Sequence, residues 1–321
     1  MMETSYPYAV GRVKALESHL INNNQWQRLW EANEVEAMKI LKEIGYGVEV
    51  TDASDVERLI DYEVKKASML INEITPEPEL TDLFLLPIDG QNLKIILKGI
   101  IQRIEVKEML QDSGSVPVEL LQKAVEYQIY DDLPEAFSKA LKELEGEKRP
   151  QKISAVIDNA VYRQILDNLR STKNELLKYY FTSKIDFTNI LTVIRGNTLD
   201  LDVHQCQRLL IRGGEISIHT FSEAIGMEIN FIPNQLSKGY YSMKIRSILD
   251  NYVLNHSVTE VEEKLNSLSF EIIYDARNDS FGIGPLAHYL LTRIREGKIL
   301  RVMFAGKRAG IKIPFSELGI I

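Results

Sequence analysis

The chain has 321 residues, of which 45% are hydrophobic and 26% are charged, an ordinary composition for a globular protein. A chain of this length can bury a sizeable core without disulfides or metal, either as two or three units or as one large domain. Its net charge of −8 argues against a nucleic-acid-binding protein, which needs a basic surface.

Helical periodicity dominates the first part of the chain. Apolar residues fall on one helical face over residues 10–21 and again over residues 35–44. Gly45 and Gly47 predict the end of the second helix, because glycine readily adopts the left-handed conformation that closes a helix.

A capping box predicts the start of the next helix at Ser54, since the side chains of Ser54 and Glu57 can accept hydrogen bonds from each other's backbone N–H groups. Pro76 and Pro78 predict its end, because proline lacks the backbone donor and clashes with the preceding turn. The apolar residues that we expect this helix to bury are Val56, Leu59, Ile60, Val64, Ala67, Leu70, Ile71 and Ile74.

The middle of the chain continues the helical pattern. An apolar stripe over residues 93–104 predicts a helix, with Asp89 as its amino-terminal cap. Pro117 and Pro134 predict the first turns of two more helices. Residues 153–180 contain no strong helix breaker, which predicts a single helix of about 28 residues. Because strand-like patterns are short, the sequence predicts an all-α protein built from helical bundles.

An internal repeat links two of these helices. The segment Ile88–Leu93 resembles Ile185–Ile190, which lies 97 residues later, and the similarity continues to Lys98 and Arg195. A weaker echo spans residues 293–301. In the two clear copies, the aspartate can cap a helix, and the asparagine three residues later can form hydrogen bonds inside the bundle. The residues of this repeat motif are Asp89, Asn92, Asp186, Asn189 and Arg195.

The spacing of the repeat predicts the domain organisation. A period near 100 residues is too long for a solenoid repeat and fits homologous helical units of domain size. We place three such units at residues 1–107, 108–205 and 206–321. The alternative is a chance similarity between two capped amphipathic helices.

The common catalytic motifs are absent from the sequence, including the phosphate loop, the dinucleotide-binding glycine pattern, the nucleophile elbow and the zinc-protease motif. His204 and Cys206 lie beside Asp200 and Asp202, which suggests a metal site or a hydrolase built on His204. We favour a polar helix start with a small buried thiol, because no further ligand cluster accompanies them. No catalytic, cofactor-binding or metal-binding residue is assigned, and no small-molecule substrate is expected.

A basic stretch lies near the carboxyl terminus. Residues 287–312 contain seven basic residues and one acid, a local net charge of +6. The stretch is either a solvated helix face or a contact surface for an acidic partner, since charge patches steer and orient assembly. Nucleic acid is a lesser alternative, because no aromatic residue except Phe304 interleaves usefully. The candidate partner contacts are Arg293, Arg295, Lys298, Arg301, Lys307 and Arg308.

Three features bear on the cellular compartment. The single cysteine, Cys206, cannot form an intrachain disulfide, which suits the reducing cytoplasm. The polar residues 1–10 lack the basic start and apolar run of a signal peptide. The most apolar segment, residues 93–104, is interrupted by three basic residues and is shorter than the roughly 18 to 20 residues of a membrane span. Any membrane role is therefore expected to be peripheral.

The order of several segments resembles the C subunit of V/A-type ATPases, whose eukaryotic counterpart is subunit d. The resemblance rests on Tyr6–Glu17, on Leu41–Gly47, on the two Ile-Asp-x-x-Asn segments, and on Tyr289–Gly306 with its Glu296 and Arg301. Together these segments extend over nearly the whole chain.

This resemblance implies a funnel of three pseudo-symmetric helical repeats on the cytoplasmic face of the membrane, as part of a membrane-bound rotary complex. It implies a non-catalytic central-stalk subunit without cofactor, which links the central axle subunits to the membrane rotor ring. Such a subunit transmits torque for transport of hydrogen ions or other ions, or for ATP synthesis. The alternative is a generic helical adaptor or regulatory protein. The transported ion and the contact residues do not follow from the sequence.

Overall fold

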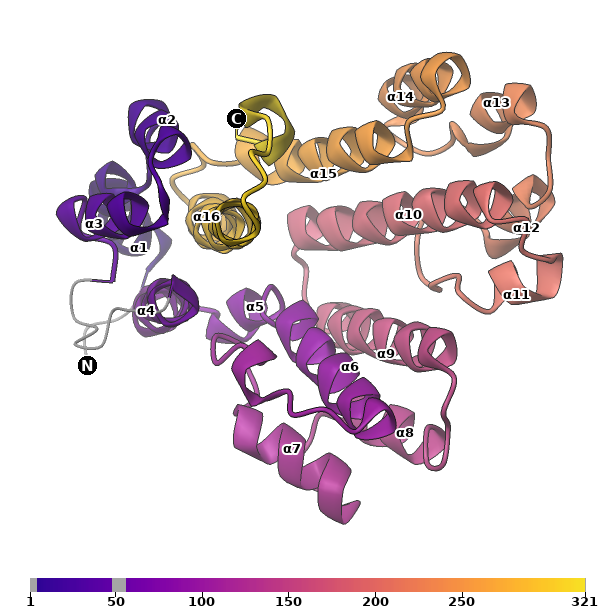
Figure 1. Cartoon of the computed structure of the whole chain (residues 1–321), viewed down its shortest axis with the longest axis horizontal. Coiled ribbons are helices and arrows are strands. Elements are labelled where there is room, and N and C mark those ends of the chain that lie inside the picture. The colour runs from indigo at the N-terminus through magenta and orange to yellow at the C-terminus, as the bar shows by residue number, and fades with distance from the viewer. Residues whose placement is uncertain (1–4, 48–55, 321) are drawn as a thin grey trace. The chain divides into compact units, whose positions relative to one another are not determined.

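The computed structural model describes residues 5–47 and 56–320, and this part of the chain contains α-helices and short 3-10 helices but no β-strand (Figure 1). The prediction of an all-α protein is confirmed. The chain divides into two compact units, which do not coincide with the three predicted repeats, so the repeat boundaries stay a prediction. Unit 1 comprises Met1–Ile88, Gln111–Ser115 and Ile273–Ile321, and unit 2 comprises Asp89–Leu110 and Val116–Ile272.

Unit 1 is built on two long helices, α4 (Val56–Ile74) and α16 (Gly284–Ala309), which make its most extensive helix contact. A Cβ atom at Gly297 would lie 2.6 Å from Cγ2 of Ile60, so glycine permits the close approach of the two helices. The other elements of this unit are α1 (Tyr6–Leu16), η1 (Glu17–His19), α2 (Asn23–Glu31), α3 (Glu34–Glu43), α5 (Pro78–Asp82) and η4 (Phe315–Leu318). Helices α1, α3 and α4 pack around α16, which Figure 1 shows end-on.

Most of the predictions for α4 are confirmed. The helix ends at Ile74, before the two prolines, and its predicted apolar face is buried except for Leu70, which is half-buried. The face also buries the carboxylate residue Glu63, which the apolar pattern did not include. Ser54 of the predicted capping box lies outside the described residues.

The first two predicted helices are partly wrong. Helix α1 ends at Leu16, and residues 17–19 continue as a 3-10 turn, so Ile21 is buried from an irregular segment. Helix α3 buries Ala37 and Leu41, whereas Val35 is exposed. Its buried face is therefore rotated from the predicted one, because packing against α2 and α16 sets the orientation.

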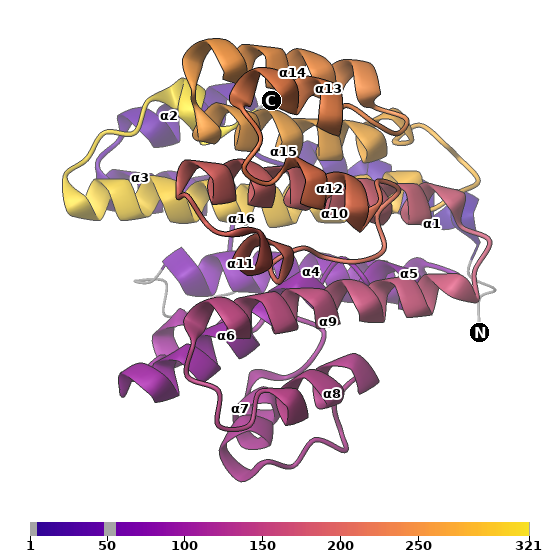
Figure 2. The same ribbon diagram turned by 90° about the vertical axis from the view of Figure 1, so that its right-hand side faces the viewer.

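Unit 2 holds the remaining helices. Helix α9 packs between α8 and α10. The carboxyl-terminal half of α10 shares a hydrophobic core with helices α12 to α15, and α15 runs beside α10 in Figure 2. The elements of unit 2 are α6 (Leu86–Gln102, whose first turn belongs to unit 1), η2 (Lys107–Met109), α7 (Val118–Tyr127), α8 (Glu135–Glu143), α9 (Pro150–Arg170), α10 (Glu175–Thr198), α11 (Val203–Gln207), α12 (Ile218–Ala224), η3 (Ile229–Phe231), α13 (Ile232–Leu236), α14 (Ser242–Asn255) and α15 (Val258–Asp275, whose last three residues belong to unit 1).

The single long helix predicted over residues 153–180 is wrong, because the chain breaks between α9 and α10. The hydroxyl of Thr172 donates to the carbonyl of Leu169, and the side chain of Asn174 accepts from the N–H of Leu177. These bonds satisfy backbone groups that a continuous helix would pair internally, so the break is stable. Pro117 and Pro134 lie just before α7 and α8, one residue outside the predicted first turns.

Candidate functional site

A buried polar pair on α6 holds the backbone of the segment that leads to α7. Asp89 and Asn92 are both fully buried, and Oδ1 of Asp89 accepts a hydrogen bond from the N–H of Val116 at 3.1 Å. Val116 directly precedes Pro117, the N-cap residue of α7. The predicted role of Asp89 as a helix cap is wrong, since α6 begins at Leu86 and Asp89 lies inside it.

The second copy of the motif makes the same kind of contact. Asp186 and Asn189 are buried in the middle of α10, so Asp186 is not a helix cap either. The side-chain amide of Asn189 donates to the carbonyl of Ile211 and accepts from its N–H, both at 2.8 Å. The carboxylate of Asp186 accepts from the N–H groups of Glu215, at 3.0 Å, and Ile216, at 3.2 and 3.3 Å. Ile216 directly precedes the N-cap residue of α12.

The surroundings of Asp186 are crowded, and its side chain is buried. A Cβ atom at Gly214 would lie 1.9 Å from Oδ1 of Asp186, so only glycine allows the backbone to approach this closely. Burial raises the pKa of Asp186 to about 7, although the backbone N–H groups act in the opposite direction. The carboxyl group is therefore held near the midpoint of its titration at neutral pH.

The weak third echo forms a corresponding contact with the amino-terminal part of the chain. On α16, Arg293 and Glu296 are buried and form an ion pair at 2.8 Å. Oε1 of Glu296 accepts from the N–H of Ile21 at 2.6 Å, and Arg293 donates to the carbonyl of His19 at 3.1 Å. Ile21 directly precedes Asn22, the N-cap residue of α2.

We call these three contacts the backbone anchors. In each one, the carboxylate residue of a buried polar pair at positions i and i+3 of a long helix accepts from the N–H of the residue that precedes the N-cap of a short helix. A buried backbone group must be paired, so each anchor fixes where the short helix begins. The pairs are Asp89 with Asn92, Asp186 with Asn189, and Arg293 with Glu296.

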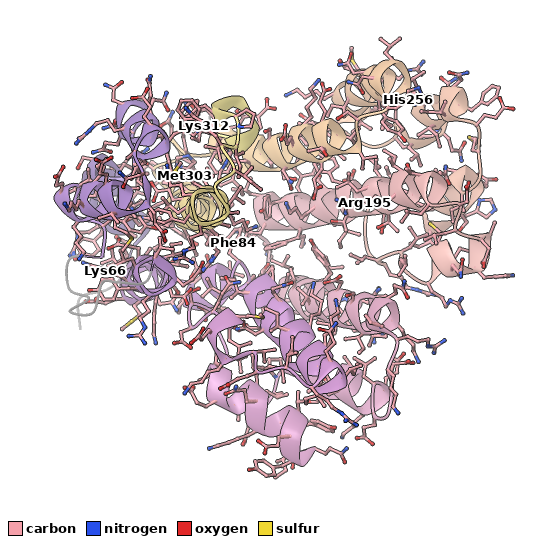
Figure 3. The ribbon with its side chains drawn as sticks, in the orientation of Figure 1. Lys66, Phe84, Arg195, His256, Met303 and Lys312 are labelled. Carbon is pink, nitrogen blue, oxygen red and sulfur yellow. The ribbon has the colours of Figure 1, made fainter. Side chains whose placement is uncertain are left out.

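A basic residue near the end of each motif joins its helix to a second long helix. Lys98 on α6 donates to Ser154 on α9 at 2.8 Å, and Arg195 on α10 (Figure 3) pairs with Glu262 on α15. In the third copy, Arg301 on α16 pairs with two carboxylates on α4, at 2.6 and 3.1 Å. In all three copies, a cation therefore joins the long helix of the motif to a second long helix.

Most residues of the basic stretch on α16 are engaged inside unit 1. Arg295 and Lys307 donate to backbone carbonyls, and Arg308 pairs with Glu34 on α3. Lys298 is exposed and makes no ion pair with a described carboxylate. That these residues contact a partner stays a prediction, and Lys298 is the candidate that its own unit leaves available.

The residues considered for a hydrolase or metal site do not converge. His204 is exposed on α11, and Asp202 forms a capping box at the start of that helix. Cys206 is buried, and burial raises the pKa of its thiol. Across residues 5–47 and 56–320, no group of three or more His, Cys, Asp and Glu residues could hold a metal ion. The arrangement favours the interpretation as a polar helix start.

Within residues 5–47 and 56–320, no helix is long and apolar enough to cross a membrane.

Comparison with known proteins matches residues 9–313 to the family model of the ATP synthase (C/AC39) subunit. The C subunit of the V-type sodium ATPase of Enterococcus hirae is 22% identical over 92% of this chain and 92% of its own length. The C subunit of the A-type ATP synthase of Methanococcoides burtonii is 23% identical over 96% of this chain and 92% of its own length. The corresponding A-type C subunit of Thermococcus kodakarensis is 23% identical over 94% of this chain and 86% of its own length.

Proposed function

We propose that this chain, which belongs to the ATP synthase (C/AC39) subunit family, is a non-catalytic central-stalk subunit of a rotary V/A-type ATPase. In this role it links the axle subunits to the membrane rotor ring and transmits torque between them. The observation that carries the proposal is the extent of the match, which covers nearly the whole chain and most of each relative's length.

The backbone anchors support a mechanical role. A part that transmits torque must resist deformation, and close-packed interiors deform little. Each anchor adds buried hydrogen bonds between a long helix and the start of a short one, and breaking such a bond leaves an unsatisfied polar group in a dry interior. The short helices are therefore tied to the long ones at defined points.

The anchors also support three pseudo-symmetric repeats, a feature that the funnel architecture requires. A buried polar pair with a carboxylate bound to the backbone, followed by a cation, recurs on α6, α10 and α16, as Asp with Asn in the first two copies and as Arg with Glu in the third. In the first two copies the anchored segment follows its long helix in the sequence, whereas in the third it is residues 19–21. We therefore propose that α2 belongs to the repeat that contains α16, which departs from the repeat boundaries predicted from the sequence.

The same proposal implies where the chain sits and which part of the complex selects the transported ion. The chain would sit peripherally, on the cytoplasmic face of the membrane complex, and bind no cofactor. The names of the relatives include both a sodium ATPase and ATP synthases. We assign ion choice to the rotor ring and not to this chain, because the role proposed here requires no ion site.

Affinity purification from detergent-solubilised membranes tests the proposal. A tag on this chain should recover the catalytic head, axle and ring subunits of one rotary ATPase, identified by mass spectrometry. A tagged exposed-site variant, His204→Ala, should recover the same set, because His204 has no part in the proposed role. Recovery of unrelated proteins without ATPase subunits would instead favour a generic helical adaptor.

A further inference from the structure

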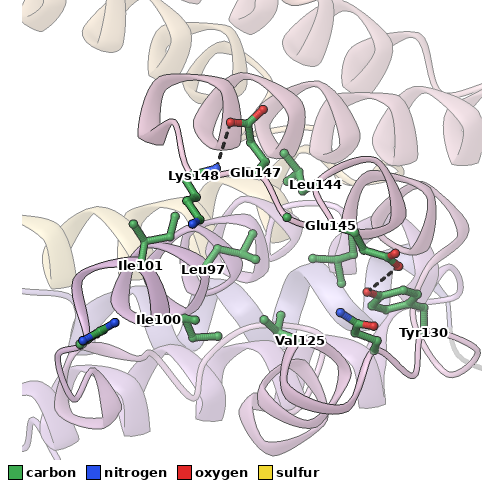
Figure 4. Close-up of a pocket in the computed structure, with 13 residues that line it drawn as sticks. Leu97, Ile100, Ile101, Val125, Tyr130, Leu144, Glu145, Glu147 and Lys148 are labelled. Atoms are coloured by element: carbon green, nitrogen blue, oxygen red, sulfur yellow. Dashed lines mark hydrogen bonds between the residues drawn. The ribbon is translucent and has the colours of Figure 1, made fainter.

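Unit 2 contains an apolar groove formed by the carboxyl-terminal ends of three helices (Figure 4). Leu97 and Ile101 of α6 lie on one side, Val125 of α7 lies on another, and Leu141 and Leu144 belong to α8 and the residue after it. The groove has a volume of about 390 Å³ and is partly open to solvent. None of the anchor residues lines it, so the groove is separate from the contacts described above.

Exposed apolar side chains continue from the groove onto the surface. Ile100, which lines the groove, is 59% exposed, and Ile104 in the same segment is 48% exposed. Tyr127 is 62% exposed and Ile129 is 59% exposed, and they flank the lining residue Gln128. Large exposed apolar surface of this kind marks interaction sites. Because it extends beyond the groove, a protein segment fits this surface better than a small ligand enclosed in a pocket.

The charges at the rim of the groove that lack an ion pair are positive on balance. Glu147 is paired with Arg149 and with a lysine on α9, whereas Glu145 accepts a hydrogen bond from the uncharged hydroxyl of Tyr130 and makes no ion pair with a described cation. The side chains of Arg103 and Lys148 also make no ion pair with a carboxylate in the described ranges, so these two cations outnumber the one carboxylate. An occupant that matches this rim therefore carries acidic groups.

We propose that this groove is the docking site for an amphipathic helix of a neighbouring subunit, whose apolar face fills the groove and whose acidic side chains pair with Arg103 and Lys148. A helix is the expected occupant because the groove is walled by helices, and an apolar helix face laid into such a groove is a recurrent recognition mode. The inference rests on the proposed function, since it requires the chain to be part of a multi-subunit complex.

Site-specific photo-crosslinking in the purified complex tests the proposal. A benzophenone amino acid in place of Tyr127 should form a cross-link to one identified subunit, through a peptide that contains both apolar and acidic residues. Arg103→Glu combined with Lys148→Glu should lower the cross-linking yield about five- to tenfold, as expected for the loss of two partly exposed ion pairs. The effect should weaken as salt is raised.

The matched control is Lys123→Glu combined with Lys142→Glu, which makes the same charge change on α7 and α8 but away from the groove lining. Equal loss of cross-linking in the control overturns the assignment of the rim charges. Arg103 also directly follows the carboxyl end of α6, where positive charge is stabilising, whereas Lys148 precedes the N-cap residue of α9. If the two charges affect only the stability of these helices, their reversal will change the melting temperature and leave the cross-link unchanged, which overturns the proposal.

Other outcomes distinguish failure of the docking proposal from failure of the proposed function. A cross-link to lipid or to a second copy of this chain overturns the proposed occupant, as does the absence of any cross-link in an assembled complex. In these cases the chain still co-purifies with ATPase subunits, and the proposed function stands. Failure of the unsubstituted chain to co-purify would overturn both.

Discussion

At the scale of single residues, the protein depends on buried polar side chains whose partners are backbone groups. Asp89 and Asp186 each bind backbone N–H groups, whereas Glu296 binds one N–H and one arginine. A carboxyl group in such a position is stabilised by its donors and destabilised by the loss of water, and the balance decides its protonation. For Asp186 burial is the larger influence, which raises its pKa to about 7.

This balance predicts a pH dependence of stability. Because the pKa of Asp186 is higher in the folded chain than in the unfolded chain, its protonated form favours folding. Protonation of Asp186 contributes at most about 4 kcal/mol to the free energy of unfolding. This contribution is fully present below about pH 4 and is lost as pH rises through about 7. Urea unfolding followed by circular dichroism between pH 5 and pH 8 measures it.

The comparison variant for this prediction is Asp186→Asn, which removes the titrating proton. The free energy of unfolding of the wild type minus that of the variant should decrease as pH rises from about 5 to about 8. The exposed control Asp131→Asn should show no such trend. A difference that grows with pH would mean that the backbone donors outweigh burial and that the carboxylate is the favoured form.

Glu296 provides a second test at this scale. Glu296→Ala should destabilise unit 1 by about 3 to 5 kcal/mol, because it leaves Arg293 buried without its bonded carboxylate and removes the acceptor for Ile21. Glu296→Gln keeps an acceptor and should cost less. The two tryptophans, Trp26 and Trp30, both lie on α2, so their fluorescence during unfolding reports this unit. If Glu296→Ala lowers the free energy of unfolding no more than the exposed control Glu223→Ala does, the stabilising role of this anchor is refuted.

At the scale of helices, periodicity and proline positions predicted much of the fold. They identified α4, its end and most of its buried face. The sequence did not reveal the break between α9 and α10, because apolar residues continue on both sides and the signal is a local one, the side-chain bonds of Thr172 and Asn174. The rotation of α3 was also missed, since it depends on which neighbours the helix packs against.

The contact between α4 and α16 yields a prediction at the helix scale. Gly297→Ala should cost about 1 to 3 kcal/mol, because the added methyl group would lie 2.6 Å from Ile60 and force the helices apart. The matched control is Gly11→Ala on α1, where nothing lies within 4 Å of the added methyl group. That change should stabilise the chain by about 0.5 to 1 kcal/mol. Tryptophan fluorescence on urea unfolding measures both, and equal effects would contradict the close packing.

At the scale of the whole molecule, the sequence disclosed the positions of the anchors but not their partners. The repeated Asp and Asn residues were visible as a motif, and their assignment as caps was wrong because their partners lie in segments 22 to 30 residues away. The third partner, Ile21, lies 275 residues from Glu296, and no local pattern reveals such a pairing. The groove was missed because its lining comes from three separate helices.

The central claim is that this chain couples rotation in the head to ion transport through the ring. The most direct measurement is the ratio of ions pumped to ATP hydrolysed in proteoliposomes that contain the complex assembled with and without this chain. Without the chain, ATP hydrolysis should continue while pumping is lost, and adding the purified chain back should restore the ratio. Unchanged coupled pumping in the complex that lacks the chain would contradict the account.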